Sequence, residues 1–280
     1  MRIAIDHLTA YKYETPARYG VQELRLTPVD TRGQKVVEWS IEAPGIEGAA
    51  EFRDCWGNRV ALINQTDERS ELAIRIRGVV ETHAGDGIVG TLEGEPPARI
   101  FMRESPLAMP DRALKAIASS LEGRHNDALS LYHALMGLIF ERMVFDTDVT
   151  DSDTTAAEAL AAGRGVCQDF AHVFIAVCRV LGHPARYVTG YLAMPQTLEQ
   201  AEAHHAWAEA EVPGLGWVGF DPANEICPDE RYVRLACGPD ASYAAPVRGI
   251  RRGSGLGQLS VSVTASVQNQ SQGQTGQLQQ

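Results

Sequence analysis

Residues 163–184 place the strongest constraint on the fold, because a glycine turn there precedes a long apolar repeat. Gly163-Arg164-Gly165 predicts a tight turn, since glycine alone accepts positive φ without a steric cost. The apolar residues that follow recur at three- and four-residue steps, which predicts a helix with a buried face. They are Phe170, Val173, Phe174, Val177 and Leu181. Gly182 and Pro184 indicate where this helix ends.

The same pattern places Cys167 in the first turn of the helix. Free backbone N–H groups and the positive end of the helix dipole stabilise negative charge at that position. Both effects favour a reactive thiolate near neutral pH. The alternative is that Cys167 is one more small buried residue, as most cysteines are. Its partners elsewhere in the chain decide between the two interpretations.

Composition excludes several classes of partner. The chain has 280 residues, enough for one large or two medium domains, and a net charge of −11. This acidic excess argues against a nucleic-acid-binding surface, which needs basic residues. No apolar run approaches the ~20 residues that span a bilayer, and the N-terminus lacks the apolar core of a signal peptide. We therefore expect a cytoplasmic protein that binds neither nucleic acid nor membrane.

Nothing in the sequence predicts a metal or another cofactor. Its five cysteines are odd in number and scattered, which is typical of free thiols in a reducing compartment. The sequence contains no CxxC pair, so we do not expect a structural zinc site. The acidic stretch 146–153 resembles a calcium loop only superficially. An EF-hand loop needs glycine at its sixth position and glutamate at its twelfth, where this chain has Asp151 and Ala157. We expect a solvated loop there.

The first 84 residues predict β-structure. Apolar and polar residues alternate with period two in residues 21–26, 36–41 and 71–77, and turn clusters separate these runs. Short strands at this spacing predict an antiparallel β-sandwich. His7 and His83 stand apart from other chemically reactive residues, so we expect surface or loop histidines. Residues 85–90 match GxGxxG, but no helix can follow them, and we interpret residues 85–99 as a linker or loop.

Helical patterns precede the glycine turn. Residues 111–121 and 128–143 carry the periodicity of core-packing helices. Thr155 and Glu158 have the spacing of a capping box, which predicts a short helix through Ala162.

Two further segments supply partners for a reactive thiol. Residues 203–212, with His204-His205, and residues 217–224, with Asp221, predict the two arms of an antiparallel hairpin beyond a strand at 185–192. A cysteine nucleophile needs an imidazole to hold its proton, and the imidazole needs an acceptor to fix its tautomer. A histidine and an aspartate on neighbouring arms can meet at cross-strand distances.

Three motifs in this order, GRGVCQDFAHVFIAVCRVLGHPARYVTGYL, HHAWAEAEV and GWVGFDPAN, resemble the bacterial transglutaminase-like superfamily. The β-rich region before them resembles the N-terminal domain of many bacterial members, and residues 232–240 and 245–249 resemble the segment after the aspartate. The resemblance implies a papain-like triad of Cys167, His205 and Asp221. His204 faces the opposite side of its strand, and the motif selects His205.

The expected fold class is α+β. We predict an antiparallel β-sandwich over residues 1–84, a linker or loop over 85–99, and a papain- or transglutaminase-like domain over 100–267. In that domain, helices and an antiparallel sheet surround a cysteine at a helix N-terminus. The final alternating run, 259–267, predicts a strand, and the glutamine-, serine- and glycine-rich residues 268–280 predict a disordered tail.

Several other residues near the motifs have competing interpretations. Trp207 alternates with His205 and should share its face, where it either walls the substrate site or packs in the core. His172 and Cys178 are expected to be packing residues, and Asp169 to cap the helix or form a local salt bridge. The backbone N–H of Cys167 is the expected oxyanion donor.

These residues predict a cysteine-dependent acyl-transfer enzyme acting on a peptide or protein amide through a thioester. Water as the acceptor makes it a peptidase or amidase, which the absence of a recognisable calcium site and the bacterial-type resemblance favour. An amine as the acceptor makes it a protein-glutamine transglutaminase. Two further alternatives are a catalytically idle peptide-binding module and a structural protein that acts through its β-rich domain.

Overall fold

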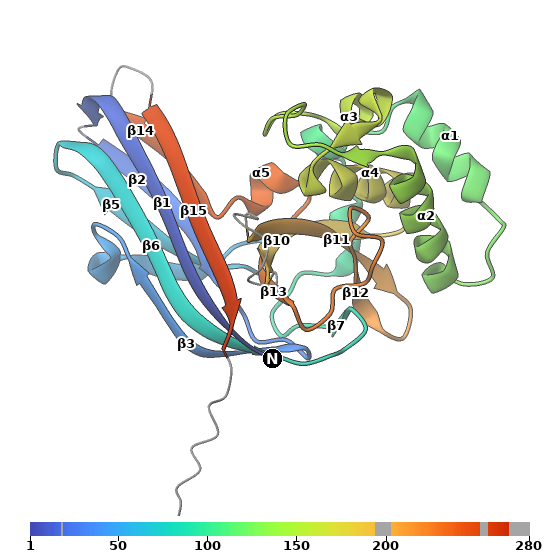
Figure 1. The fold of residues 1–280 in the computed structure, drawn as a ribbon, viewed down its shortest axis with the longest axis horizontal. Coiled ribbons are helices and arrows are strands. Elements are labelled where there is room, and N and C mark those ends of the chain that lie inside the picture. Colours follow the sequence, from blue (N-terminus) through green and yellow to red (C-terminus); the bar gives the residue numbers. More distant parts are fainter. Residues whose placement is uncertain (18, 194–202, 253–256, 269–280) are drawn as a thin grey trace, which may run out of the picture.

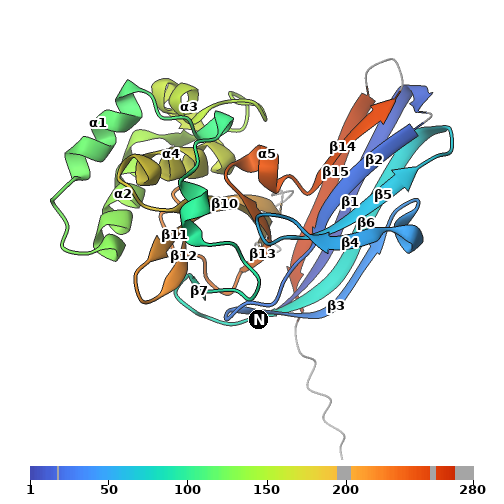
Figure 2. The same ribbon diagram turned by 180° about the vertical axis from the view of Figure 1, so that it is seen from behind.

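The computed structural model describes residues 1–17, 19–193, 203–252 and 257–268. Figures 1 and 2 show a β-sandwich of long strands beside a second part in which helices cover a sheet. The architecture confirms the predicted α+β class, with an antiparallel sandwich and a second part in which helices lie on an antiparallel sheet.

Two four-stranded antiparallel sheets form the sandwich. One has the order β15-β1-β6-β3 and the other β14-β2-β5-β4. The strands span Arg2–Ala17 (β1), Tyr19–Thr27 (β2), Gln34–Glu42 (β3), Ala50–Arg53 (β4), Arg59–Gln65 (β5), Arg69–Thr82 (β6), Val247–Arg252 (β14) and Gly257–Val267 (β15). Alternate residues of both sheets point inward and share one core, which includes Ile5, Leu24, Ile63 and Ile74. The period-two pattern of the sequence is the direct cause of this layer.

The chain returns to the sandwich at its end, which differs from the domain boundaries expected from the sequence. Strands β14 and β15 pair with β2 and β1, with Ile250 opposite Val21 and Ala265 opposite Ile5. Residues 247–267 therefore complete the N-terminal sheets although the sequence groups them with residues 100–246. Strand pairing over more than 200 residues leaves no local pattern that could reveal it. The predicted tail, apart from residue 268, lies outside the described residues.

A five-stranded antiparallel sheet of order β13-β10-β11-β12-β7 organises the second part. Its strands are Ile88–Gly90 (β7), Ala185–Leu192 (β10), His204–Val212 (β11), Gly216–Phe220 (β12) and Tyr232–Gly238 (β13). The segment expected to be a linker, 85–99, thus contributes an edge strand and the start of a short 3-10 helix at Ala98–Met102. Two further 3-10 turns span Ile46–Gly48 and Pro106–Ala108.

Helices pack on one face of this sheet (Figure 1). They are α1 (Arg112–Leu121), α2 (Ala128–Arg142), α3 (Ala156–Ala162), α4 (Cys167–Val180) and the short α5 (Ala241–Ala244), and α1 and α2 match the predicted helices to within one residue at each end. Helix α4 lies against β11, and its apolar residues share a core with Ala206, Ala208 and Ala210. The small alanine side chains allow the buried helix to approach the strand closely. None of the helices in the described ranges is long and apolar enough to cross a membrane.

The sandwich and the sheet share a buried interface. Tyr191 of β10 and Val233 of β13 belong to the same apolar cluster as the sandwich core. His7 of β1 is 3% exposed, with Nδ1 2.9 Å from the Tyr191 hydroxyl and Nε2 2.9 Å from Thr9 Oγ1. The expectation of a surface or loop histidine is therefore wrong for His7, because its partner lies 184 residues away. His83 is exposed, as expected.

Candidate active site

The residues before Cys167 form a turn that only glycines permit. Gly163 ends α3 with a φ of 66°, and the capping box of Thr155 and Glu158 starts that helix as predicted. Residues Arg164–Gly165 form β9, which pairs in parallel with β8, Val144–Phe145. A Cβ atom on Gly165 would lie 2.5 Å from Oδ2 of Asp169. The chain can therefore pass this close to the helix start only without a side chain at residue 165.

Cys167 is the first residue of α4 and is half-buried. Its N–H is among those at a helix start that have no intrahelical acceptor. Oδ2 of Asp169 accepts hydrogen bonds from the Val166 N–H and the Thr150 hydroxyl, both at 2.8 Å. Asp169 thus caps the helix, which is one of the two predicted roles, and burial raises the pKa of its carboxyl.

His205 and Asp221 meet across β11 and the end of β12. Nε2 of His205 donates to Oδ2 of Asp221 at 2.6 Å, and both side chains are almost completely buried. Oδ2 also accepts hydrogen bonds from the Tyr232 hydroxyl at 2.7 Å and from Nδ2 of Asn224 at 2.8 Å. Oδ1 of Asp221 accepts hydrogen bonds from the backbone N–H groups of Ala223 and Asn224. The carboxylate is therefore held from several directions. Because it binds Nε2 of His205, the other ring nitrogen, Nδ1, is available to a second partner.

Electrostatics tie the three predicted residues together. Burial raises the pKa of Asp221, but the hydrogen bonds and charge of its partners, His205 foremost, outweigh this and hold it below the usual value. Burial lowers the pKa of His205, whereas the neighbouring Asp221 and Cys167 side chains raise it to about 10. Cys167 is thus close enough to interact with the imidazole. The structure brings Cys167, His205 and Asp221 together in the order that the motif assigns.

Two aromatic side chains shield the imidazole. Trp207 shares the face of His205, and their rings stack at a centroid distance of 6.4 Å. Tyr232 contacts both rings edge-on, at 5.7 Å from His205 and 5.4 Å from Trp207. Trp207 is only 2% exposed, so its ring packs behind the imidazole and keeps water from it. Direct contact between Trp207 and a substrate stays a prediction.

The neighbouring histidines and Cys178 lie away from this cluster. His204 points to the other side of β11, where Nε2 is 2.9 Å from the Thr189 hydroxyl. His172 is completely buried and accepts a hydrogen bond from the Ala241 N–H at 3.1 Å. Cys178, near the end of α4, is completely buried in the core that this helix shares with the sheet. All three occupy structural positions.

Sequence reasoning did not assign roles to Asn224 and Tyr232. Asn224 follows Asp221 by three residues, a spacing at which an Asx-type turn brings side chain and backbone together. That signal was available. Tyr232 reaches Asp221 from β13 across an intervening loop, and no local pattern indicates this contact.

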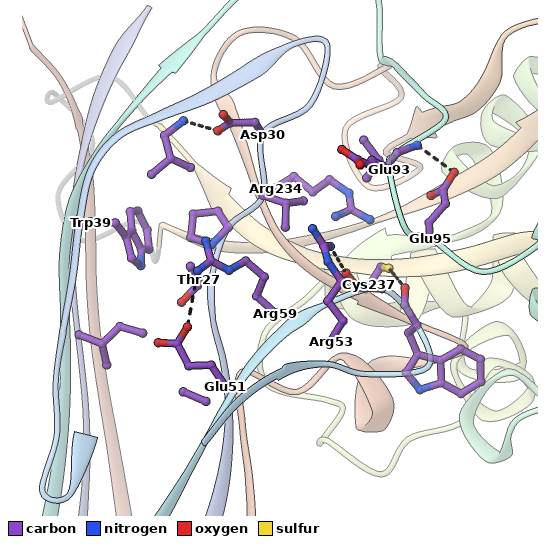
Figure 3. A pocket seen from close by; sticks show the side chains of 18 of the residues that line it. Thr27, Asp30, Trp39, Glu51, Arg53, Arg59, Glu93, Glu95, Arg234 and Cys237 are labelled. Atoms are coloured by element: carbon purple, nitrogen blue, oxygen red, sulfur yellow. Dashed lines mark hydrogen bonds and ion pairs between the residues drawn. The ribbon is translucent and has the colours of Figure 1, made fainter. Parts of the chain in front are cut away.

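A cavity of about 680 Å³ lies between the sandwich and the sheet, apart from the triad. In Figure 3, Arg53, Arg59 and Arg234 extend into it. Arg186 and Arg234, which line it, both pair with the completely buried Glu209, at 2.6 Å and 2.8 Å. Arg186 also pairs with Glu95 at 3.0 Å and stacks on Trp217. These pairs balance the buried charges and join the loop after β7 to the sheet. The parts of the chain that the structure describes contain no cluster of side chains suited to a metal ion.

Comparison with known proteins gives two family matches. The model of the bacterial transglutaminase-like N-terminal region matches residues 3–81, and that of the transglutaminase-like superfamily matches residues 115–222, which include Cys167, His205 and Asp221. Residues 115–222 are therefore transglutaminase-like, and residues 3–81 are of the bacterial transglutaminase-like N-terminal type. It is 29% identical over 276 residues to "Uncharacterized protein ML0607" of Mycobacterium leprae, covering 94% of this chain and 97% of that protein. It is 27% identical over 275 residues to "Uncharacterized protein Rv2569c" of Mycobacterium tuberculosis, covering 89% and 87%.

A solved structure shows the same arrangement of this transglutaminase-like fold. It is the crystal structure of "a Putative Cysteine Protease from Cytophaga hutchinsonii", which is 25% identical. The two superpose with a TM-score of 0.73, covering 95% of this chain and 90% of that one. The likeness therefore includes the sandwich as well as the papain-type domain.

Proposed function

We propose that this transglutaminase-like protein is a cysteine-dependent acyl-transfer enzyme that acts on peptide or protein amides, with water as its usual acceptor. The observation that carries the proposal is the position of His205, held at 2.6 Å by Asp221 on one side and interacting with Cys167 on the other. A thiol, an imidazole and an orienting carboxylate are the parts that nucleophilic acyl transfer needs.

In the proposed reaction, Nδ1 of His205 takes the thiol proton and the Cys167 sulfur attacks the amide carbonyl carbon. The carbonyl oxygen gains negative charge and is stabilised by the Cys167 N–H at the start of α4. His205 then returns the proton to the leaving amine as the C–N bond breaks, which leaves a thioester. Water attacks the thioester after giving a proton to His205, the carboxylic acid leaves, and the thiol is restored. Asp221 keeps the proton on Nε2 throughout.

Hydrolysis is the preferred outcome because the similar solved structure carries a cysteine-protease name. The alternative, transfer to a primary amine, uses the same thioester and the same residues. We propose a peptide or protein amide as the substrate in either case, in a cytoplasmic setting.

Replacement of Cys167 by alanine tests the proposal. Iodoacetamide is expected to label residue 167 in the wild type, and peptide-amide turnover should disappear in Cys167→Ala. Cys55→Ala is the matched control, because Cys55 is an exposed free thiol on the loop between β4 and β5 and is 150 residues from His205 in the sequence. Addition of a primary amine during turnover separates hydrolysis from transfer by the mass of the product. Equal turnover in Cys167→Ala and the wild type would overturn the proposal.

A further inference from the structure

Exposed apolar side chains lie beside the strand that leads to Cys167. Strand β8 pairs in parallel with β9, and Phe145 is opposite Gly165, two residues before the cysteine. Val144 is 68% exposed and Phe145 is 53% exposed, and Val149 on the following loop is 42% exposed. Large apolar side chains this exposed within one short segment are candidates for an interaction surface.

The direction of Phe145 follows from its partner. Paired residues of neighbouring strands point to the same side of a sheet. On that side of Gly165 lies the carboxylate of Asp169, in the first turn of α4. Phe145 therefore lies on the side of the β8–β9 pair that faces the start of α4, where the thiol is, and more than half of it remains accessible.

One edge of β8 is available for pairing. The N–H groups of Val144 and Asp146 donate to the carbonyl groups of Gly163 and Gly165, both at 2.9 Å. In a parallel ladder, the N–H and C=O of the intervening residue, Phe145, point to the opposite edge. Within the described ranges, β8 has β9 as its only strand neighbour. A free strand edge can accept an extended peptide by backbone hydrogen bonds.

The loop after β8 adds negative charge and is attached to α4. The Thr150 hydroxyl donates to Asp169, and Nε2 of Gln168 donates to the Ser152 carbonyl at 3.4 Å. This attachment keeps four aspartates near the start of the helix: Asp146, Asp148, Asp151 and Asp153. Asp146 pairs with Arg164 at 3.3 Å, and no ion pair to the other three occurs among the residues that the structure describes. This surface therefore combines an apolar strand with three carboxylates, those of Asp148, Asp151 and Asp153, that have no cationic partner among the described residues.

We propose that β8 and the loop through Asp153, here called the β8 surface, bind the acyl-donor substrate. The inferred substrate is an extended peptide segment with a large apolar side chain next to lysine or arginine. The apolar side chain lies against Phe145 and Val149, the backbone pairs with the free edge of β8, and the cation faces the aspartates. Charge complementarity selects a basic peptide over a second copy of this chain, whose net charge is −11. This inference names the substrate of the proposed function and rests on it.

Binding of fluorescent peptides to Cys167→Ala protein tests the β8 surface without any need for turnover. Three peptides are compared by fluorescence anisotropy: one with adjacent leucine and lysine, one with leucine and glutamate, and one with serine and lysine. The leucine–lysine peptide is expected to bind most tightly. Phe145→Ser should weaken its binding about tenfold, as expected for the loss of one apolar contact. Leu259→Ser, at a site 54% exposed on the sandwich, is the matched control and should leave the affinity unchanged.

The charge is tested in the same background. Asp148→Asn with Asp153→Asn should reduce the preference for lysine over glutamate about threefold to tenfold and weaken the dependence of affinity on salt. Glu71→Gln, an exposed acid on β6, should change neither. Equal affinity for all three peptides, or equal effects of Phe145→Ser and Leu259→Ser, would overturn the inference. Iodoacetamide labelling of wild-type Cys167 reports separately on the proposed function, so the two failures are distinguishable.

Discussion

Removal of the Tyr232 hydroxyl is expected to disturb the triad without disturbing its packing. Tyr232→Phe deletes one of three side-chain hydrogen bonds to Oδ2 of Asp221 but keeps the ring that contacts His205 and Trp207. A hydrogen bond to a charged group contributes about 1.5–3 kcal/mol. If the bond is retained in the transition state, its loss lowers kcat/KM by roughly tenfold to a hundredfold. The remaining donors make the lower part of this range the expected result.

The direction of the pH effect follows from the pKa shifts. The partners of Asp221 hold its pKa below the usual value, so the loss of one donor raises it. The carboxylate stays ionised near neutral pH with one donor fewer to share its charge, so its interaction with the imidazolium does not weaken and the pKa of His205 stays at or above about 10. The acidic limb of the pH–rate profile should move to higher pH, whereas the basic limb should not move to lower pH. The range of pH over which the enzyme is active becomes narrower on its acidic side.

The assay is the pH profile of Cys167 alkylation and of peptide-amide kcat/KM, measured for the wild type and Tyr232→Phe. Tyr191→Phe is the matched control, because its hydroxyl interacts with His7 at a buried site that does not touch the triad. That control should lose stability but keep the profile of the wild type. An unchanged profile and rate in Tyr232→Phe would refute the assignment of Tyr232 as a positioning residue.

Three other perturbations have expected outcomes. Burial lowers the pKa values of His7, His172 and His204 to about 4. The unfolded chain therefore takes up protons at higher pH than the folded one, and the free energy of unfolding decreases as pH falls from about 6.5 towards 4. The loss is at most about 3 kcal/mol for each histidine. Urea midpoints between pH 7 and pH 4 measure this loss, and a pH-independent midpoint would contradict it. Gly165→Ala places a methyl group 2.5 Å from the Asp169 carboxylate and should cost about 1–3 kcal/mol and slow Cys167 alkylation, whereas Gly48→Ala, which meets no atom within 4 Å, should do neither. Glu209→Gln leaves the charges of Arg186 and Arg234 less well neutralised and should lower the free energy of unfolding by about 3–5 kcal/mol, measured in urea. A loss below about 1 kcal/mol would contradict a stabilising role for these ion pairs.

Local sequence patterns predict the elements well because their causes are local. The apolar steps from Phe170 to Leu181 create a helix that begins at Cys167, and the Thr155–Glu158 capping box forms as predicted. The period-two runs become strands of the sandwich. The hairpin arms bring His205 and Asp221 within hydrogen-bonding distance, because cross-strand neighbours share a face.

Long-range contacts explain what the sequence did not reveal. Strands β14 and β15 join sheets begun more than 200 residues earlier, so residues 247–267 lie in the sandwich. His7 is buried by Tyr191, and Tyr232 reaches Asp221 from another strand. Each of these contacts depends on how the two parts pack, and pairs of distant residues carry no periodic signal in one sequence.

Detection of a thioester on Cys167 is the most direct test of acyl transfer by this residue. Protein quenched with acid during turnover of an activated peptide ester is analysed by intact mass and peptide mapping. An added acyl mass is expected on residue 167. It should appear before product, be absent in Cys167→Ala, and be lost on addition of hydroxylamine. Normal turnover with the acyl group on a residue other than Cys167, or with no acylated protein, would contradict this mechanism.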